Sequence, residues 1–166
     1  MCRIVTDGFD SVVMKRVRDG ETEMAKTFTV KHRVEFRDTD AARIMHFSAF
    51  FTYMEETEHA FLRSIGLSVM NCEVEGVHIS WPRVSVHCDY QKPLKFEQEF
   101  EVATRIKKLG GKSVTYGFVF SNQDAESVAQ GEMTVVCCSM GEEGIRAVEI
   151  PAIIREKLGV YEDARE

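Results

Sequence analysis

Apolar and polar side chains alternate strictly over one early segment of the chain. From Thr27 onward every second position is apolar or aromatic, at Phe28, Val30, His32, Val34 and Phe36. The positions between them carry Thr, Lys, Arg and Glu. A period of two places each set on one face of an extended chain, so residues 27–36 are predicted to form a half-buried strand. Residues 1–26 show no clean period and are predicted to be an N-terminal extension.

A helical period replaces the alternation after residue 46. Large apolar residues recur at helical spacing, at Phe47, Phe50, Phe51, Met54, Phe61 and Ile65. Ser48 is of a type that caps helix N-termini, and Gly66 suits the left-handed residue that follows a helix. The pattern predicts a helix of about 17 residues, about 26 Å long, with one flank facing the core.

The rest of the chain is predicted to form four strands and one short helix. The strands are expected at 77–90, 96–107, 112–121 and 127–140, and the helix at 151–159. Pro82 interrupts the first of these strands, which predicts a bulge or an edge position. Leu-Gly-Gly-Lys at 109–112 is typical of a hairpin turn.

This order of elements predicts a single α+β domain. Strands and helices do not alternate, which disfavours a doubly wound sheet or an α/β barrel. We expect one domain over residues 27–160, in which one long helix packs against a curled antiparallel sheet of about five strands. Residues 161–166 are predicted to be a C-terminal tail.

Charge and cysteine content narrow the classes of function. The 166 residues carry 21 Lys and Arg against 27 Asp and Glu, a net charge of −6, which argues against nucleic-acid binding through bulk positive charge. No run approaches the roughly 18 apolar residues that a membrane span needs. The five cysteines include no Cys-x-x-Cys pair, and no apolar segment resembles a signal peptide. We therefore expect a cytoplasmic protein with reduced thiols.

The loop between the first strand and the long helix concentrates candidate chemistry. It carries Asp38, Asp40 and His46 and leads directly into a helix N-terminus. Such a terminus presents unpaired N–H groups and partial positive charge, which stabilise an anion or a developing oxyanion. The alternative is a simple turn, in which the aspartates bond to the local backbone and His46 is solvated. The two aspartates could also bind a metal ion, but no third ligand lies at a suitable spacing, so no metal is expected.

Longer stretches around this loop resemble a known family. Residues 34–42 (Val-Glu-Phe-Arg-Asp-Thr-Asp-Ala-Ala) followed by 50–56 (Phe-Phe-Thr-Tyr-Met-Glu-Glu) are similar to hotdog-fold acyl-CoA thioesterases of the 4-hydroxybenzoyl-CoA thioesterase type. Three later motifs occur in the family's order, at 81–84, 89–94 and 109–113. The resemblance covers roughly residues 31–158. It implies a hotdog fold, hydrolysis of a small aromatic or short-chain acyl-CoA, and no cofactor.

The resemblance also implies roles for single residues. The family's catalytic aspartate corresponds to Asp40, which would attack the thioester carbonyl or activate water. The backbone N–H groups of Phe47 and Ser48 would stabilise the oxyanion. His46 matches a histidine of a short-chain branch and could assist catalysis. Glu55 lies near the helix position that carries the catalytic carboxylate in other hotdog thioesterases, so it is the reserve candidate.

The expected acyl pocket departs from the family's pattern. It is predicted to comprise Arg43, Phe50, Phe51 and Glu58. Arg43 replaces a usual glycine, which predicts either strain in the turn or a new positive charge at the pocket. Ala49 and Phe50 stand where many relatives carry Asn and Tyr, which makes the pocket less polar. Glu58 lies within the apolar stripe of the helix, so its charge must be paired, line a pocket or lie at a subunit interface.

Coenzyme A requires local positive charge on this acidic chain. The densest basic cluster of the folded part is expected on one hairpin, at Arg105, Lys107, Lys108 and Lys112. This cluster either holds the CoA phosphates or is a solvated hairpin tip. A lone hotdog subunit leaves one face uncovered, which predicts a homodimer or homotetramer. The alternative functions are an acyl-CoA-binding hotdog protein without catalysis and a hotdog hydratase or dehydratase.

Overall fold

The computed structural model describes residues 26–69, 72–74, 76–141 and 144–163. The predicted extension 1–26 therefore lies, apart from Lys26, outside the described residues. The elements of the described part are β1 (Phe28–Arg33), the 3-10 helix η1 (Phe36–Asp38), α1 (Ala49–Ser64), β2 (Cys72–Val74), β3 (Val77–Ser80), β4 (Arg83–Tyr90), β5 (Glu99–Leu109), β6 (Ser113–Asn122), β7 (Ser127–Val136), β8 (Cys138–Gly141), β9 (Gly144–Ala147) and α2 (Ala152–Gly159).

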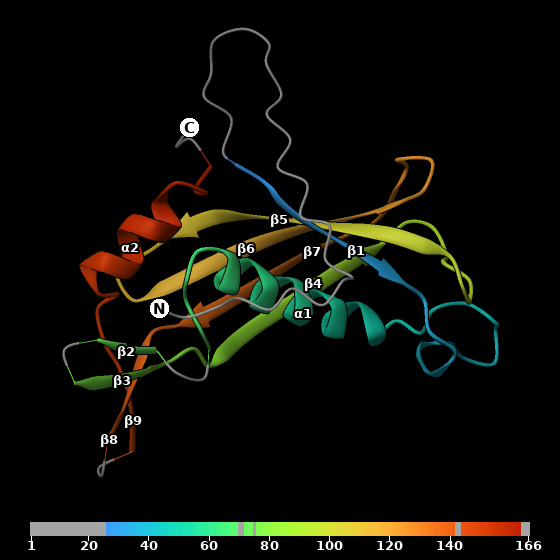
Figure 1. Cartoon of the computed structure of the whole chain (residues 1–166). Helices are drawn as coiled ribbons and strands as arrows, with labels where there is room; N and C mark the ends of the chain where they lie inside the picture. Colours follow the sequence, from blue (N-terminus) through green and yellow to red (C-terminus); the bar gives the residue numbers. More distant parts are fainter. Residues whose placement is uncertain (1–25, 70–71, 75, 142–143, 164–166) are drawn as a thin grey trace, which may run out of the picture.

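Five strands form the main sheet, in the order β1-β5-β6-β7-β4, and every neighbouring pair is antiparallel. In β5 the side chains of Phe100, Val102, Thr104 and Ile106 are buried, and those between them are more exposed. Helix α1 lies across the inner face of this sheet (Figure 1). The predicted mixed class with antiparallel pairing is confirmed, and the arrangement is consistent with a hotdog domain.

Helix α1 approaches the sheet closely over β7. Its Met54 is fully buried, and a Cβ atom added to Gly131 would lie 2.6 Å from Met54 Cε. The same Cβ would lie 3.0 Å from the carbonyl oxygen of His87. Glycine at position 131 therefore permits this close packing. The helix ends at Ser64, and the left-handed residue predicted after it is confirmed, because Gly66 has a φ of 70°.

A second sheet of four strands, in the order β2-β3-β8-β9, accompanies the main one. The sequence pattern did not indicate it, so the expectation of one sheet of about five strands is wrong for the molecule as a whole. The segments 77–90 and 127–140 were each expected to form one strand. Each instead divides between the two sheets, as β3 with β4 and as β7 with β8.

The break near Pro82 has the predicted consequences. Trp81 and Pro82 separate β3 from β4, and the register of β4 against β7 shifts between Arg83 and Ser85. Because β4 is the last strand of the main sheet, it also has the predicted edge position. The proline carbonyl still accepts a hydrogen bond of 3.0 Å from the N–H of Val136.

The packed region continues past the expected boundary at residue 160. Tyr161 is 8% exposed, and its carbonyl oxygen accepts a 3.0 Å bond from the N–H of Ile106 in β5. The N–H of Asp163 donates in turn to the Ile106 carbonyl at 2.9 Å. Residues 161–163 thus pair with the main sheet and are not a free tail.

Candidate active site

The segment that leads into α1 folds back on itself. The N–H of Asp40 donates to the Ile44 carbonyl at 3.1 Å, and the N–H of His46 donates to the Asp38 carbonyl at 2.7 Å. The N–H of Met45 is bonded to the Leu94 carbonyl at 2.7 Å, which ties the loop to the β4–β5 connection. These backbone bonds fix the loop at one end of the sheet, beside the N-terminus of α1 (Figure 1).

The two aspartates of the loop have different surroundings. Asp38 accepts a 2.6 Å hydrogen bond at Oδ2 from the Tyr53 hydroxyl of α1. Its carboxylate also caps η1, because Oδ2 accepts the N–H of Glu35 at 3.3 Å. Burial and the nearby Asp38 carboxylate raise the pKa of Tyr53, so this hydroxyl keeps its proton. Asp38 therefore holds the loop against α1, which is a structural role.

Asp40 is exposed and has a free oxygen. Its Oδ1 accepts the N–H of Ala42 at 2.8 Å, which is the Asx turn considered as the non-catalytic alternative. Its Oδ2 has no hydrogen-bond partner within the described residues. The side chain lines an open hollow of about 670 Å³ together with Phe36, Thr39, Ala41, Arg43 and Phe96. The Asx turn orients the carboxylate and leaves one oxygen available to a ligand.

Arg43 occupies the left-handed region of backbone space. Its φ is 62°, a conformation that glycine adopts without steric cost and that side chains with a Cβ adopt at a cost of about 1–2 kcal/mol. The strain expected from an arginine at a usual glycine position is therefore present. Arg43 is also exposed and lines the hollow at Asp40, without an ion pair in the described part of the chain.

The N-terminus of α1 presents the backbone groups predicted to bind an oxyanion. The N–H of Phe47 has no hydrogen-bond acceptor among the described residues. The N–H of Ser48 donates to His46 Nδ1 at 3.3 Å, and the Ser48 hydroxyl lies 2.7 Å from the same nitrogen. Ser48 therefore does not cap the helix with its side chain, contrary to the prediction. Since a backbone N–H can only donate, Nδ1 accepts, and the proton of the neutral imidazole is on Nε2.

Tyr90 is part of this region, although the sequence analysis places it only in the motif at 89–94 and assigns it no role. Its hydroxyl donates a 3.1 Å hydrogen bond to the Phe47 carbonyl, 43 residues away in the chain. Its ring lies edge-to-face on Phe50, with centroids 5.0 Å apart. Tyr90 thus fixes the peptide unit that joins Phe47 to Ser48. No periodic or motif signal relates a residue at the end of β4 to the helix N-terminus.

The predicted acyl-pocket residues are not brought together. Phe50 is in the core, where its ring also contacts Phe120 at 5.1 Å between centroids, and Phe51 is half-buried against the core. Glu58 lies further along α1 and is 1% exposed. Of the four, only Arg43 lines the hollow at Asp40 within the described chain.

Glu58 belongs to a separate cluster of charges between α1 and β4. Arg83 Nη2 donates to Glu58 Oε2 at 2.6 Å and to His59 Nε2 at 3.1 Å, and it lies 2.9 Å from Glu55 Oε1. Glu58 Oε1 and Arg83 Nε are buried without hydrogen-bond partners in the described structure. Burial raises the pKa of Glu58 to about 7, because it outweighs the attraction of Arg83. Burial and Arg83 also lower the pKa of His59.

This cluster resolves two earlier expectations. Of the three possibilities for Glu58, the structure shows the paired carboxylate. Glu55, the reserve catalytic candidate, shares the same guanidinium and does not line the hollow at Asp40. The sequence places Arg83 only within the motif at 81–84, because no sequence pattern relates it to the helix carboxylates.

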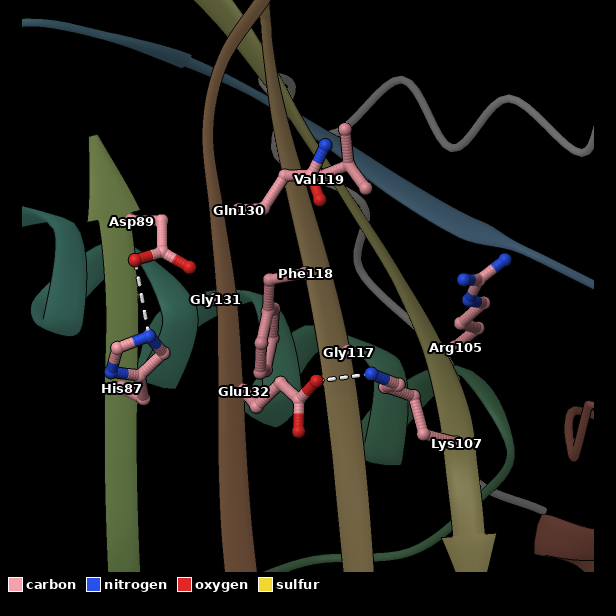
Figure 2. A pocket seen from close by; sticks show the side chains of 10 residues that line it. All are labelled: His87, Asp89, Arg105, Lys107, Gly117, Phe118, Val119, Gln130, Gly131 and Glu132. Atoms are coloured by element: carbon pink, nitrogen blue, oxygen red, sulfur yellow. Dashed lines mark hydrogen bonds and ion pairs between the residues drawn. The ribbon is translucent and has the colours of Figure 1, made fainter. Parts of the chain in front are cut away.

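The predicted CoA-binding cations lie at the other end of the sheet from Asp40. Arg33, which ends β1 before the loop, pairs with Glu99 at the start of β5, while the basic residues lie on the second half of β5 and on the hairpin that follows. Arg105 is 3.2 Å from Asp163, and Lys107 forms an ion pair with Glu132. Figure 2 shows both basic side chains, which line a pocket on the outer face of the sheet together with His87, Asp89 and Glu132. Within one chain, therefore, this cluster and the hollow at Asp40 are separate.

No helix of the described residues is long and apolar enough to cross a membrane. Over the same residues, no group of His, Cys, Asp or Glu side chains could hold a metal ion.

Known proteins share both the sequence pattern and the architecture. The family model of the thioesterase-like superfamily matches residues 34–158. A curated protein of Aquifex aeolicus that carries an esterase name is 32% identical over 97 residues, which cover 58% of this chain and 74% of that protein. The 4-hydroxybenzoyl-CoA thioesterase of a Pseudomonas species is 25% identical over 134 residues, covering 78% and 95%.

The fold agrees with these sequence matches. The crystal structure of a 1,4-dihydroxy-2-naphthoyl-CoA thioesterase from Synechocystis superposes with a TM-score of 0.72, at 22% identity, covering 80% of this chain and 96% of that one. The family match spans the Asp40 loop, helix α1 and the whole main sheet except β1. The chain therefore belongs to the thioesterase-like superfamily and is a thioester hydrolase of that family.

Proposed function

We propose that this protein hydrolyses the thioester of a small aromatic or short-chain acyl-CoA, with Asp40 as the catalytic carboxylate. The observation that carries the proposal is the contrast between two aspartates of one loop. Asp38 is bonded to Tyr53 and to the backbone of Glu35, whereas Asp40 is oriented by a single N–H and keeps Oδ2 free at an open hollow. A thioester is already activated, so one positioned carboxylate and one set of oxyanion donors suffice.

The residues support two routes that differ in the first step. As a nucleophile, an Asp40 oxygen attacks the carbonyl carbon, the C–S bond breaks, CoA leaves as its thiolate, and water then hydrolyses the acyl-aspartyl anhydride. As a general base, Asp40 takes a proton from a water molecule that attacks the carbonyl, and the C–S bond again breaks to release CoA. Both routes give the free acid and CoA.

The oxyanion that forms in either route needs N–H donors at the start of α1. The Phe47 N–H has no acceptor among the described residues and lies at the helix N-terminus, where the helix dipole also favours negative charge. The Ser48 N–H makes only a long bond to His46, which an oxyanion could displace. His46 thus acts on the oxyanion donors through Ser48 in this proposal.

The decisive experiment replaces Asp40 with Asn and measures release of free CoA thiol from benzoyl-CoA and butanoyl-CoA. Loss of a nucleophile or general base lowers kcat by about 10²- to 10⁴-fold, so we expect that loss with little change in KM or in melting temperature. Asp124→Asn, in the exposed β6–β7 turn, is the matched control and should retain activity. Equal kcat values for wild type and Asp40→Asn would contradict the mechanism, and Glu55→Gln would then test the reserve candidate.

Thiol release, acyl-CoA binding and the chemical state of the acyl group, measured on the same substrates, separate the alternative functions. Saturable binding of acyl-CoA without thiol release would indicate a binding protein. A modified acyl group on intact CoA would indicate a hydratase or dehydratase. Thiol release by the wild type supports hydrolysis.

We also propose a homodimer formed through the edge strand β4. Its outer edge has no neighbouring strand among the described elements, and it exposes Val84 and Val86. A twofold axis beside β4 would reverse the partner sheet, so the partner's basic hairpin would lie at the same end as Asp40 of this chain. Lys108 and Lys112, which have no ion pairs among the described residues, would then be available to CoA phosphates. Sedimentation analysis distinguishes this dimer from a monomer or a tetramer.

A cytoplasmic location remains our proposal for this protein. Its support is the state of the cysteines in the described part, where Cys72, Cys88, Cys137 and Cys138 are all buried free thiols.

A further inference from the structure

Two phenylalanines at the Asp40 hollow are exposed although they are large and apolar. Phe36 is 77% exposed and Phe96 is 46% exposed. The alternating pattern of the first strand would bury Phe36, but β1 ends at Arg33 and η1 turns this residue outward. Phe96 reaches the same place from the β4–β5 connection. Apolar side chains gathered at a hollow on the surface are typical of a binding site.

The two rings form an ordered pair. Their centroids are 5.8 Å apart and their planes meet at 83°, an edge-to-face arrangement. Such a pair leaves ring surface open toward the hollow, where a third ring can stack on one phenylalanine and meet the edge of the other. The geometry therefore favours a flat, apolar ligand group.

The polar side chains of the hollow restrict which part of a substrate contacts this pair. Thr39, Asp40 and Arg43 are its polar lining residues. A thioester carbonyl within reach of Asp40 must place either its acyl group or its pantetheine arm beside the rings. The arm carries amide groups that need hydrogen-bond partners, whereas the acyl group needs apolar contact. The aromatic pair is thus better suited to the acyl group.

We infer that Phe36 and Phe96 form the acyl-binding wall and select planar aromatic acyl groups over short linear ones. The inference rests on the proposed function, since it takes Asp40 as the group that meets the thioester carbonyl. Within the predicted pocket of Arg43, Phe50, Phe51 and Glu58, it replaces Phe50 and Glu58, which are interior residues of the described chain. A hollow of about 670 Å³ accommodates one aromatic ring with its thioester group.

The first test compares benzoyl-CoA with butanoyl-CoA for Phe36→Ala and Phe96→Ala. We expect each variant to lose about tenfold in kcat/KM for benzoyl-CoA and less than about twofold for butanoyl-CoA, because only the aromatic acyl group contacts both rings. Ile153→Ala, an exposed apolar side chain on α2, is the control and should change neither value. Equal losses for both substrates, or no loss for benzoyl-CoA, would overturn the inference.

A binding measurement keeps the inference testable apart from turnover. In the Asp40→Asn protein, calorimetry compares two non-hydrolysable CoA thioethers, one with a phenacyl group and one with a 2-oxopentyl group. We expect tighter binding of the phenacyl compound, and loss of that preference when Phe36 or Phe96 is changed to Ala. Absence of thiol release by the wild type would contradict the proposed function alone, whereas equal binding of the two thioethers would overturn this inference.

A third measurement tests whether the aromatic pair is exposed because it forms a contact between subunits. If Phe36 and Phe96 were a contact between subunits, their replacement would change the sedimentation of the protein. We expect both variants to keep the wild-type oligomeric state, and dissociation on either replacement would overturn the assignment to the acyl group.

Discussion

The two aspartates of the loop before α1 have different roles because they have different hydrogen-bond partners. Asp38 and Asp40 are separated by one residue, but only Asp38 is held by a side chain of α1. An Asp38 substitution would therefore lower activity by displacing the loop, and it would lower the melting temperature as well. Measurement of both quantities is needed to distinguish such a substitution from one at Asp40.

The strained backbone at Arg43 gives a prediction about stability. Glycine relieves the cost of the left-handed conformation but gains freedom in the unfolded chain, so Arg43→Gly should raise the free energy of unfolding by about 0.5–1 kcal/mol. Arg43→Ala keeps a Cβ atom and should give no such gain. Urea unfolding of the three proteins measures the difference. A stabilised Arg43→Ala variant would show that the arginine side chain, and not the left-handed backbone, lowers the stability of the wild type.

Single residues of the site were predictable only where a motif names them. Asp40 follows from the resemblance of residues 34–42, and Arg43 is the departure from the family's pattern directly after them. The structure gives both a position at the same hollow. Tyr90 and Arg83 lie in the motifs at 89–94 and 81–84, but those motifs do not indicate their contacts with Phe47 and Glu58, which depend on how β4 packs beside α1. Phe96 could not be assigned to the site from the sequence, because its partner Phe36 was expected to be buried.

At the scale of elements, the fit of α1 on the sheet depends on a glycine. Gly131→Ala places a methyl group against Met54 and against the His87 carbonyl, so the helix or the sheet must shift. We expect a loss of about 1–3 kcal/mol in the free energy of unfolding. Thermal or urea unfolding measures it.

The neighbouring strand offers a matched control for that change. A Cβ atom at Gly117 of β6 would meet only the flexible stem of Lys107 within 3 Å. This side chain is partly exposed and can move, so Gly117→Ala should cost less than about 0.5 kcal/mol. Equal losses of unfolding free energy for Gly131→Ala and Gly117→Ala would mean that alanine destabilises the strands themselves, and that the contact with α1 is not the cause.

Strand positions followed from the hydrophobic pattern, but the division into two sheets did not. Residues 127–140 are apolar on both faces over their second half, so periodicity alone cannot locate a break. The break lies at Cys137, whose N–H bonds to the Lys112 carbonyl while its own carbonyl accepts the N–H of Val148. These partners are distant in sequence, and only the three-dimensional arrangement identifies them.

At the scale of the whole molecule, Glu58 makes stability depend on pH. Its pKa is about 7 in the folded protein against 4.5 for an ordinary glutamate, so between these values the folded state holds a proton that the unfolded chain releases. Stability therefore falls as pH rises through this interval. The difference is on the order of 3 kcal/mol. Arg83, Glu55 and His59 lie in the same cluster as Glu58.

The matched variant is Glu58→Gln, which cannot ionise. We expect the wild type to lose stability relative to this variant as the pH is raised from about 4.5 to 7, as measured by urea unfolding at several pH values. A constant difference over this interval would show that the pairing with Arg83 keeps Glu58 ionised throughout.

The free N–H of Phe47 has a consequence for hydrogen exchange. Its two predecessors are bonded, Met45 to Leu94 and His46 to Asp38, each at 2.7 Å. In deuterated water the amide of Phe47 should exchange within the dead time of the measurement, while those of Met45 and His46 should persist until the domain opens. A bound thioether with a carbonyl at the oxyanion position should slow Phe47 selectively. Slower deuterium uptake at this one amide would thus report that the carbonyl group of the ligand has reached the oxyanion position, even though the thioether is not hydrolysed.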